Sequence, residues 1–203
     1  MYYFSIDKTS VAEYKDRGSR FIAYCFPLKD ADDFKAILQG LKKEHSKAVH
    51  HCFAYRIGLD GNNFRVNDDG EPSSSAGKPI LNAIDSKQLT NVLVVVVRYF
   101  GGTLLGVPGL INAYKTVAVM GLQLVPTIQY PIEVSYHLEF NYTMMNEVMI
   151  IVKHYNCTVL KQDYQLFNIL EIGIPKMRLQ EVLNKLKELH TVDVKPVGIN
   201  VKY

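Results

Sequence analysis

The chain has 203 residues, 48% of them hydrophobic, which is enough to build one or two globular domains with buried cores. Its longest strongly apolar run, residues 92–97, is far shorter than the roughly 20 residues that span a bilayer. The N-terminal segment has no signal-peptide core. We therefore expect a cytoplasmic protein without membrane contact. The formal net charge is +3, and residues 1–130 carry 15 Lys and Arg against 12 Asp and Glu, an excess that permits contact with nucleic acid without requiring it.

The first 130 residues predict a mixed α/β domain. Residues 20–28 are aromatic and apolar, which predicts a strand, and the apolar positions between Phe34 and Leu41 recur at helical spacing, which predicts a helix from about residue 30 to residue 45. The run at 92–97 is apolar throughout, as is typical of a central strand covered on both faces. The other predicted elements are strands at 50–58 and 64–66 and helices at 79–89 and 105–124.

A second domain is predicted over residues 131–203. Pro126 and Pro131 bracket a predicted linker, which places the domain boundary after residue 130. The remaining pattern gives strands at 132–140, 157–165, 167–174 and 197–203 and helices at 142–155 and 176–189. This βαββαβ order indicates a ferredoxin-like domain, so the fold class is α+β.

Three cysteines, Cys25, Cys52 and Cys157, are widely spaced and form no CxxC pair. An odd number without metal-ligand spacing predicts reduced thiols, not a disulfide framework or a zinc site. We expect them to be buried as small hydrophobic side chains.

The segment 67–78, NDDGEPSSSAGK, has no hydrophobic period and predicts a functional or mobile loop. Its carboxylates, from Asp68, Asp69 and Glu71, suit a hard cation such as magnesium, although no cofactor is predicted from the spacing. In a structural alternative, Asn67 and Asp68 bond to nearby backbone N–H groups while one carboxylate pairs with Arg56 or Arg98. Ser73, Ser74 and Ser75 do not form a nucleophile elbow.

A strand, a diglycine turn and a helix start follow one another in residues 92–110, VLVVVVRYFGGTLLGVPGL. Gly101 and Gly102 allow close backbone approach, and the helix start offers unpaired N–H groups, so an anion is one candidate ligand. The segment is not a Walker loop, because Val107 and Pro108 stand where Lys and Ser or Thr are required. The alternative is that the two glycines only turn the chain.

His50 and His51 are consecutive on a predicted strand, so their side chains should lie on opposite faces. Either one is a candidate general base or metal ligand, and a structural histidine is the alternative. The signal for nucleic-acid binding is electrostatic and lacks a specific motif. The residues that could supply cations or stacking rings are Lys42, Lys43, Lys47, Tyr55, Arg56, Arg65, Arg98 and Tyr99.

Four segments resemble the YigZ/IMPACT family: SRF at 19–21, AVHHCFAYRIG at 48–58, RVNDDGEPSSSAGKPIL at 65–81 and NVLVVVVRYFGGTLLGVPGLINAY at 91–114. The resemblance covers residues 1–130 strongly. It implies an N-terminal α/β sandwich like the second domain of ribosomal protein S5, followed by the ferredoxin-like domain. In eukaryotic members the family domain is joined to an RWD domain and modulates the control of translation initiation. This chain has no room for an RWD domain, so no RWD-mediated partner is expected.

The matching motif residues are our binding candidates, and we expect them to share one surface: His50, Tyr55, Arg56, Asn67, Asp68, Asp69, Glu71, Arg98, Tyr99, Gly101 and Gly102. The chain departs from the family pattern at Ser74 and Ser75, at Pro108, and at Asn112, which stands where an Arg is usual. The departure at Asn112 weakens the hypothesis of an anion site.

Two functions follow as hypotheses. The first is a non-catalytic, translation-linked protein that contacts RNA or the ribosome through Arg56, Arg98 and nearby lysines. The second is an enzyme or sensor that binds a phosphorylated small molecule, with or without magnesium, at the NDDGEP loop and the diglycine turn. The density of Asp, Glu, Arg and Gly in those two segments motivates the second hypothesis.

Overall fold

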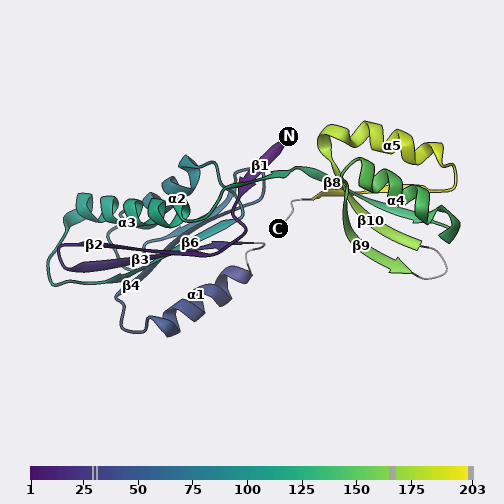
Figure 1. Ribbon diagram of the computed structural model, residues 1–203. Helices are drawn as coiled ribbons and strands as arrows, with labels where there is room; N and C mark the ends of the chain where they lie inside the picture. Colours follow the sequence, from purple (N-terminus) through teal and green to yellow (C-terminus); the bar gives the residue numbers. More distant parts are fainter. Residues whose placement is uncertain (29, 31, 165–167, 201–203) are drawn as a thin grey trace. The chain divides into compact units, whose positions relative to one another are not determined.

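The computed structural model describes residues 1–28, 30, 32–164 and 168–200. The chain divides into two compact units. One comprises residues 3–129, and the other comprises residues 130–200 together with Met1 and Tyr2. Each unit combines helices with an antiparallel sheet of its own, which confirms the α+β class (Figure 1).

The first unit contains a five-stranded antiparallel sheet in the order β2-β3-β6-β4-β5. Its strands are β2 (Ser10–Asp16), β3 (Ser19–Pro27), β6 (Val92–Tyr99), β4 (His50–Ile57) and β5 (Asn63–Asn67). Helices α2 (Gly77–Ser86) and α3 (Gly106–Gln123) cover one face, and α1 (Asp33–Glu44) covers the other (Figure 1). The unit is therefore an α/β sandwich with three layers.

The central position predicted for the apolar run at 92–97 is confirmed. Val92, Val94 and Val96 point into the core under α2 and α3, whereas Leu93 and Val95 point into the core under α1. Successive side chains of a strand alternate between faces, so a strand buried on both sides must be apolar at every position.

Three strands were not predicted from the sequence. The edge strand β2 alternates with charged residues such as Glu13 and Lys15, so it lacks a continuous apolar signal. The short strands β1 (Tyr2–Ser5) and β7 (Ile128–Pro131) form a two-stranded sheet, so the segment predicted as a linker contains a strand. The loop predicted at 67–78 is shorter in the structure, because Asn67 belongs to β5 and Gly77 already begins α2. Helix α2 ends at Ser86, before the predicted end near residue 89.

The second unit has the βαββαβ order predicted for a ferredoxin-like domain. Its elements are β8 (Glu133–Phe140), α4 (Met145–His154), β9 (Thr158–Tyr164), β10 (Asn168–Pro175), α5 (Leu179–Glu188) and β11 (Asp193–Asn200). The sheet order is β11-β8-β10-β9, and α4 and α5 pack on one face over Leu138, Phe140 and Leu170 (Figure 1). The last strand begins at Asp193, earlier than predicted, and the predicted residues 201–203 lie outside the described part of the chain.

The two helices of the second unit each begin one turn later than predicted. Short 3₁₀ turns, η1 (Tyr142–Met144) and η2 (Lys176–Arg178), occupy the residues where the α-helices were expected to start. Among the described residues, no helix of either unit combines the length and the apolarity that crossing a bilayer requires.

Candidate functional site

Segments far apart in the sequence meet at one end of the five-stranded sheet. In the strand register His50 lies opposite Arg98, and Arg20 lies opposite Tyr99. The Val49 backbone N–H donates to the Arg98 carbonyl at 2.9 Å, which ties the segment after α1 to the same end. The β2–β3 turn, the diglycine turn and the start of β4 are therefore neighbours.

A buried ion pair lies at the centre of this end. Arg98 Nη1 donates to Glu71 Oε1 at 2.6 Å, and the two side chains are only 6% and 3% exposed. The Tyr114 hydroxyl donates to the same Oε1 at 2.7 Å. Burial raises the pKa of Tyr114, so the phenol keeps its proton and serves as a donor. The Arg98 guanidinium also lies 5.4 Å from the Phe21 ring centroid, a cation–π contact that partly replaces lost hydration.

The carboxylate of Asp68 shapes the NDDGEP loop. It accepts hydrogen bonds from the backbone N–H groups of Ser74, Ala76 and Gly77 at 2.8 to 3.0 Å, so it closes the loop and satisfies orphan donors at the start of α2. Asn67 Oδ1 accepts from the Asp69 N–H at 2.6 Å. These bonds are the ones that the structural alternative for Asn67 and Asp68 predicts.

The remaining carboxylates of the loop also have protein partners. Asp69 Oδ2 accepts from the His51 backbone N–H at 2.7 Å, and Asp69 Oδ1 lies 3.5 Å from Lys42 Nζ. Glu71 is the carboxylate that pairs with Arg98. Across the residues that the structure describes, no group of three or more His, Cys, Asp and Glu side chains is arranged to hold a metal ion.

His50 is oriented by a bond to the same loop. Its Nδ1 lies 2.7 Å from the Asp69 carbonyl oxygen, which can only accept, so Nδ1 carries a proton. The other ring nitrogen, Nε2, lies 3.8 Å from Glu71 Oε1. As the alternation of a strand requires, His51 lies on the opposite face, where burial lowers the pKa of its imidazole and Asp69 partly offsets that shift.

These side chains form the floor of a cavity of about 380 Å³, which we call the Arg98 pocket. Its polar lining consists of His50, Glu71 and Arg98, and its apolar lining consists of Val49, Pro72, Phe100, Leu104, Leu105, Val107 and Leu110. Leu104 is 82% exposed and Phe100 is 46% exposed. Several large apolar side chains thus stand in solvent around a small polar floor, an arrangement typical of a ligand site.

Of the sequence-predicted candidates, His50, Glu71 and Arg98 line this pocket, and three of the others lie well away from it. Tyr55 is buried under α1, on the other face of the sheet. Tyr99 also points to that face, where its hydroxyl bonds to His45 Nδ1 at 2.9 Å. Arg56 lies six residues along β4 from His50, or roughly 20 Å, and its Nε donates to Asp85 Oδ1 at 2.8 Å. The expectation of one surface shared by all candidates was therefore wrong for these residues.

The diglycine turn owes its first glycine to close packing. A Cβ atom on Gly101 would lie 1.9 Å from the Gly18 carbonyl carbon, so the two turns touch backbone to backbone. Gly102 has a φ of +85°, a conformation that favours glycine. Packing against Gly18 thus explains Gly101, and the turn conformation explains Gly102, without a ligand.

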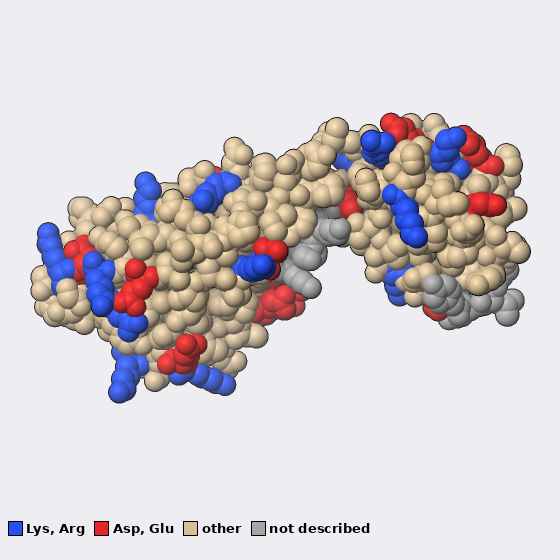
Figure 2. Space-filling model, in the orientation of Figure 1, with Lys and Arg blue, Asp and Glu red and all other residues tan. Residues whose placement is uncertain are grey.

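Cations also gather at the end of the unit where the pocket lies. Lys15, Arg17 and Arg20 come from the ends of β2 and β3 and the turn between them, and Lys42, Lys43 and Lys47 come from the end of α1 and the segment after it. We call these six residues the cationic edge. Figure 2 shows Lys and Arg side chains gathered at this end of the unit, with Asp and Glu interspersed. Lys15, Arg17 and Phe100 were not among the residues predicted from the sequence. The one signal that could have found them is their position beside or within the segments that resemble the family.

The cysteines are free thiols, as predicted, with Cys25 and Cys52 buried and Cys157 half-buried. Burial raises the pKa of Cys25 to about 11, and it also raises the pKa of Cys52, whose Sγ lies 3.0 Å from the Asp68 carbonyl oxygen. Since the thiolate is the reactive form, neither thiol is a nucleophile at neutral pH.

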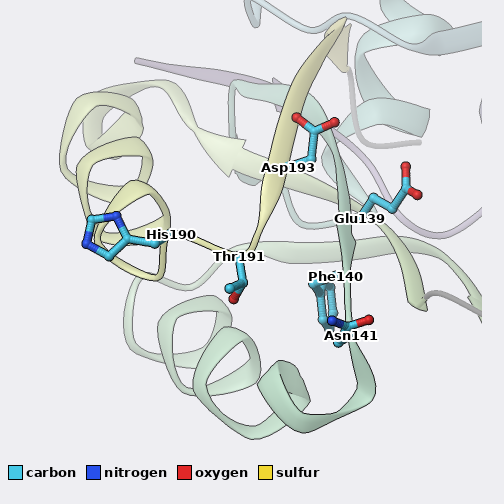
Figure 3. A pocket seen from close by; sticks show the side chains of 6 residues that line it. All are labelled: Glu139, Phe140, Asn141, His190, Thr191 and Asp193. Carbon is cyan, nitrogen blue, oxygen red and sulfur yellow. The ribbon is translucent and has the colours of Figure 1, made fainter.

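A second cavity, of about 290 Å³, lies in the second unit (Figure 3). Asp193 and Glu139 face each other on the neighbouring strands β11 and β8, and the ring of His190 points away from them (Figure 3). Lys195 holds the pKa of Asp193 below its usual value, so that carboxyl is ionised at neutral pH. Two adjacent carboxylates make this cavity unfavourable for anionic ligands.

Comparison with known proteins gives consistent results along the chain. Residues 17–122 match the Impact N-terminal domain. An IMPACT family member of Haemophilus influenzae is 33% identical over 88% of this chain and 87% of its own length. The IMPACT family member YigZ of Escherichia coli is 31% identical over 85% of each chain. A solved structure described as a hypothetical protein covers 99% of this chain and 98% of its own, with 26% identity and a TM-score of 0.74.

Proposed function

The chain belongs to the IMPACT family, and on this basis we propose that it is a cytoplasmic, non-catalytic, translation-linked protein whose first unit contacts structured RNA, free or in the ribosome. The cationic edge is the surface that we assign to this contact. A relative named Protein IMPACT, from Oryctolagus cuniculus, is 36% identical over 45% of this chain and 30% of its own length. The resemblance to eukaryotic members that modulate translation initiation supports the translation link.

The observation that carries the proposal is the state of the cations at the edge. Arg17, Lys43 and Lys47 are exposed, and within the described part of the chain none of them forms an ion pair. Free surface cations release the counterions of a phosphate backbone when they bind it, and this release supplies most of the non-specific affinity for nucleic acid. The exposed ring of Phe100 at the same end offers a stacking face for an unpaired base.

The contact residues differ from those expected from the sequence alone. Arg98 is buried and neutralised by Glu71, and Arg56 is paired with Asp85. A guanidinium that is already paired with a carboxylate gains less from a phosphate than a free one, although Arg98 Nε has no hydrogen-bond partner among the described residues. We therefore assign the RNA contact to the free cations of the edge in place of these two arginines.

The proposal of a non-catalytic protein rests on the state of the polar groups in the Arg98 pocket. Glu71 is held by two donors, and the nearest thiol, that of Cys52, is protonated because burial raises its pKa. The alternative of a phosphorylated ligand with magnesium has less support, because the Arg98 guanidinium that would attract a phosphate is already paired with Glu71 in this pocket.

Binding of a fluorescently labelled structured RNA, measured by anisotropy across a salt series, tests the proposal. We expect measurable affinity near 50 mM salt and a loss of roughly tenfold or more by about 200 mM, because several phosphates are contacted. An absence of binding at low salt, or an affinity that does not change with salt, would count against it. Thermal-shift measurements with nucleotides and magnesium test the alternative, since a specific ligand raises the apparent stability by mass action.

A further inference from the structure

The guanidinium of Arg98 has more hydrogen-bond donors than the described residues have acceptors for it. Of its five N–H groups, one on Nη1 donates to Glu71 and one on Nη2 donates to Ser19. Its Nε is buried and has no partner in the part of the chain that the structure describes, which is an unfavourable state for a donor. Arg98 lines the Arg98 pocket, so an oxygen acceptor bound there would supply the missing partner. The half-exposed Phe100 ring, 5.6 Å from the guanidinium, can turn aside to admit it.

The start of α3 adds backbone donors to the same pocket. Gly106 and Val107 begin this helix of 18 residues and line the pocket, and no side chain caps the helix. The first N–H groups of a helix have no acceptor inside it, and Pro108 at the next position has no N–H at all. The helix dipole also places a partial positive charge at this end. The buried guanidinium and the helix start therefore both require an acceptor.

The charges at the pocket floor favour a neutral acceptor. Apart from His50, the described residues that line the pocket carry one cation, Arg98, and one anion, Glu71, and these two form an ion pair. An anionic ligand would share the guanidinium with Glu71 and would be repelled by that carboxylate. A carbonyl oxygen accepts the same hydrogen bonds without this repulsion. A neutral carbonyl group thus suits the floor better than a carboxylate or a phosphate.

The walls of the pocket favour an apolar group beside that carbonyl. Phe100 and Leu104 are well exposed, and Val107 is 45% exposed. Covering such side chains removes apolar surface from water, which is favourable. The cavity of about 380 Å³ lies near the lower end of the size range of ligand sites. It therefore suits a single large apolar side chain with a carbonyl next to it.

The exposed apolar surface continues outside the pocket along α3. Ile111 is 39% exposed and lies one helical turn beyond Val107, on the same side of the helix. A small molecule in the pocket would leave Ile111 in contact with water. A chain that continues past the pocket would cover it. The extent of the apolar surface thus favours a polypeptide as the occupant.

We propose that the Arg98 pocket binds one large apolar side chain of a partner polypeptide, such as a leucine, together with the peptide carbonyl beside it. The carbonyl accepts from the Arg98 guanidinium or from the start of α3, and the side chain packs against Phe100 and Leu104. The inference goes beyond the proposed function, because it requires neither RNA nor the cationic edge.

Blocked amino acids test the pocket, because they carry the side chain and the peptide carbonyls without a charge. The ¹⁵N-labelled full chain is titrated with N-acetyl-leucine N-methylamide, with the alanine analogue and with N-acetyl-leucine as the free acid, and amide shift changes give the dissociation constants. The leucine diamide is expected to bind with a dissociation constant of about 1 mM, as suits a ligand of this size. The alanine analogue should bind roughly tenfold more weakly, because it lacks most of the apolar side chain. The free acid should bind no more tightly than the diamide.

Variants locate the contact on the protein. Phe100→Ala and Leu104→Ala should each weaken the binding of the leucine diamide about three- to tenfold, whereas Val11→Ala, an exposed apolar change on β2, should not. Arg98→Lys keeps a cation beside Glu71 and removes the Nε donor, so it should also weaken binding. N-acetyl-leucyl-leucine N-methylamide should bind several-fold more tightly than the single residue, and Ile111→Ala should remove this gain.

An absence of shift changes at the pocket, equal affinities for the leucine and alanine compounds, or unchanged affinity in both Phe100→Ala and Leu104→Ala would overturn the inference. Tighter binding of the free acid would replace the neutral occupant with an anion, and a longer compound without a gain in affinity would remove the polypeptide. None of these outcomes decides the proposed function, which depends on salt-dependent RNA binding at the cationic edge.

Discussion

Arg98 and Glu71 form an ion pair of 2.6 Å that is almost completely removed from solvent. Arg98 belongs to the central strand β6, and Glu71 belongs to the loop between β5 and α2, so the pair fastens this loop to the sheet. Tyr114 from α3 joins them through its hydroxyl. A single carboxylate oxygen thus connects three segments of the first unit.

Breaking this pair should be costly. Arg98→Met leaves the Glu71 carboxylate buried with one donor fewer, and Glu71→Gln leaves the guanidinium without its counter-ion, so each change should lower the free energy of unfolding by about 3–5 kcal/mol. The double variant should lose clearly less than the sum, because neither charge is then left alone. Urea denaturation followed by circular dichroism measures all three. Additive losses would show that the two side chains are not coupled.

The contact between the two turns gives a second prediction. Gly101→Ala should lower the free energy of unfolding by about 1–3 kcal/mol, because its Cβ meets the Gly18 backbone and one turn must move. Gly40→Ala is the matched control, since nothing lies within 4 Å of its Cβ in the interior of α1. That change should raise the free energy of unfolding by about 0.5–1 kcal/mol. A neutral Gly101→Ala would contradict the close packing of the turns.

The buried thiols predict a loss of stability in alkali. The pKa of Cys25 is raised to about 11 in the folded protein, against roughly 8.5 in the unfolded chain. The folded state therefore keeps a proton that the unfolded state loses, so this contribution is complete below about pH 8.5 and disappears as the pH rises through about 11. Denaturant unfolding between about pH 8 and pH 10 should show the decline, and Cys25→Ala should make it shallower. An identical slope in the variant would argue against burial as its cause.

Strong periodic patterns explain why most of the fold could be predicted. The amphipathic helices and the apolar strand β6 carry signals that do not depend on their neighbours, so the βαββαβ order of the second unit was predicted correctly. The edge strand β2 and the short strands β1 and β7 were missed. Their residues are polar or few, and their pairing is decided by partners elsewhere in the chain.

The candidate site was predicted only in part. A motif identifies residues, but it does not say on which face of the sheet each side chain lies. His50, Glu71 and Arg98 meet as expected, whereas the period of two along a strand turns Tyr99 away from Arg98 and Tyr55 away from the pocket. That alternation was available in the sequence. The contribution of Tyr114 to the ion pair was not, since it depends on how α3 packs on the sheet.

The salt dependence of RNA binding tests the central claim most directly, when it is measured on variants that remove charge from one end of the first unit. The triple variant Arg17→Gln, Lys43→Gln, Lys47→Gln removes free cations of the edge. The control Lys8→Gln, Lys87→Gln, Lys115→Gln removes the same charge elsewhere on the first unit.

The account predicts that the edge variant binds RNA more weakly than the unchanged protein. Its slope of log affinity against log salt should become shallower by about 2, because each lost phosphate contact on a single strand removes roughly 0.7 from the slope. The control should keep a slope close to that of the unchanged protein. Equal slopes in the two variants, or no RNA binding by the unchanged protein at low salt, would contradict the account.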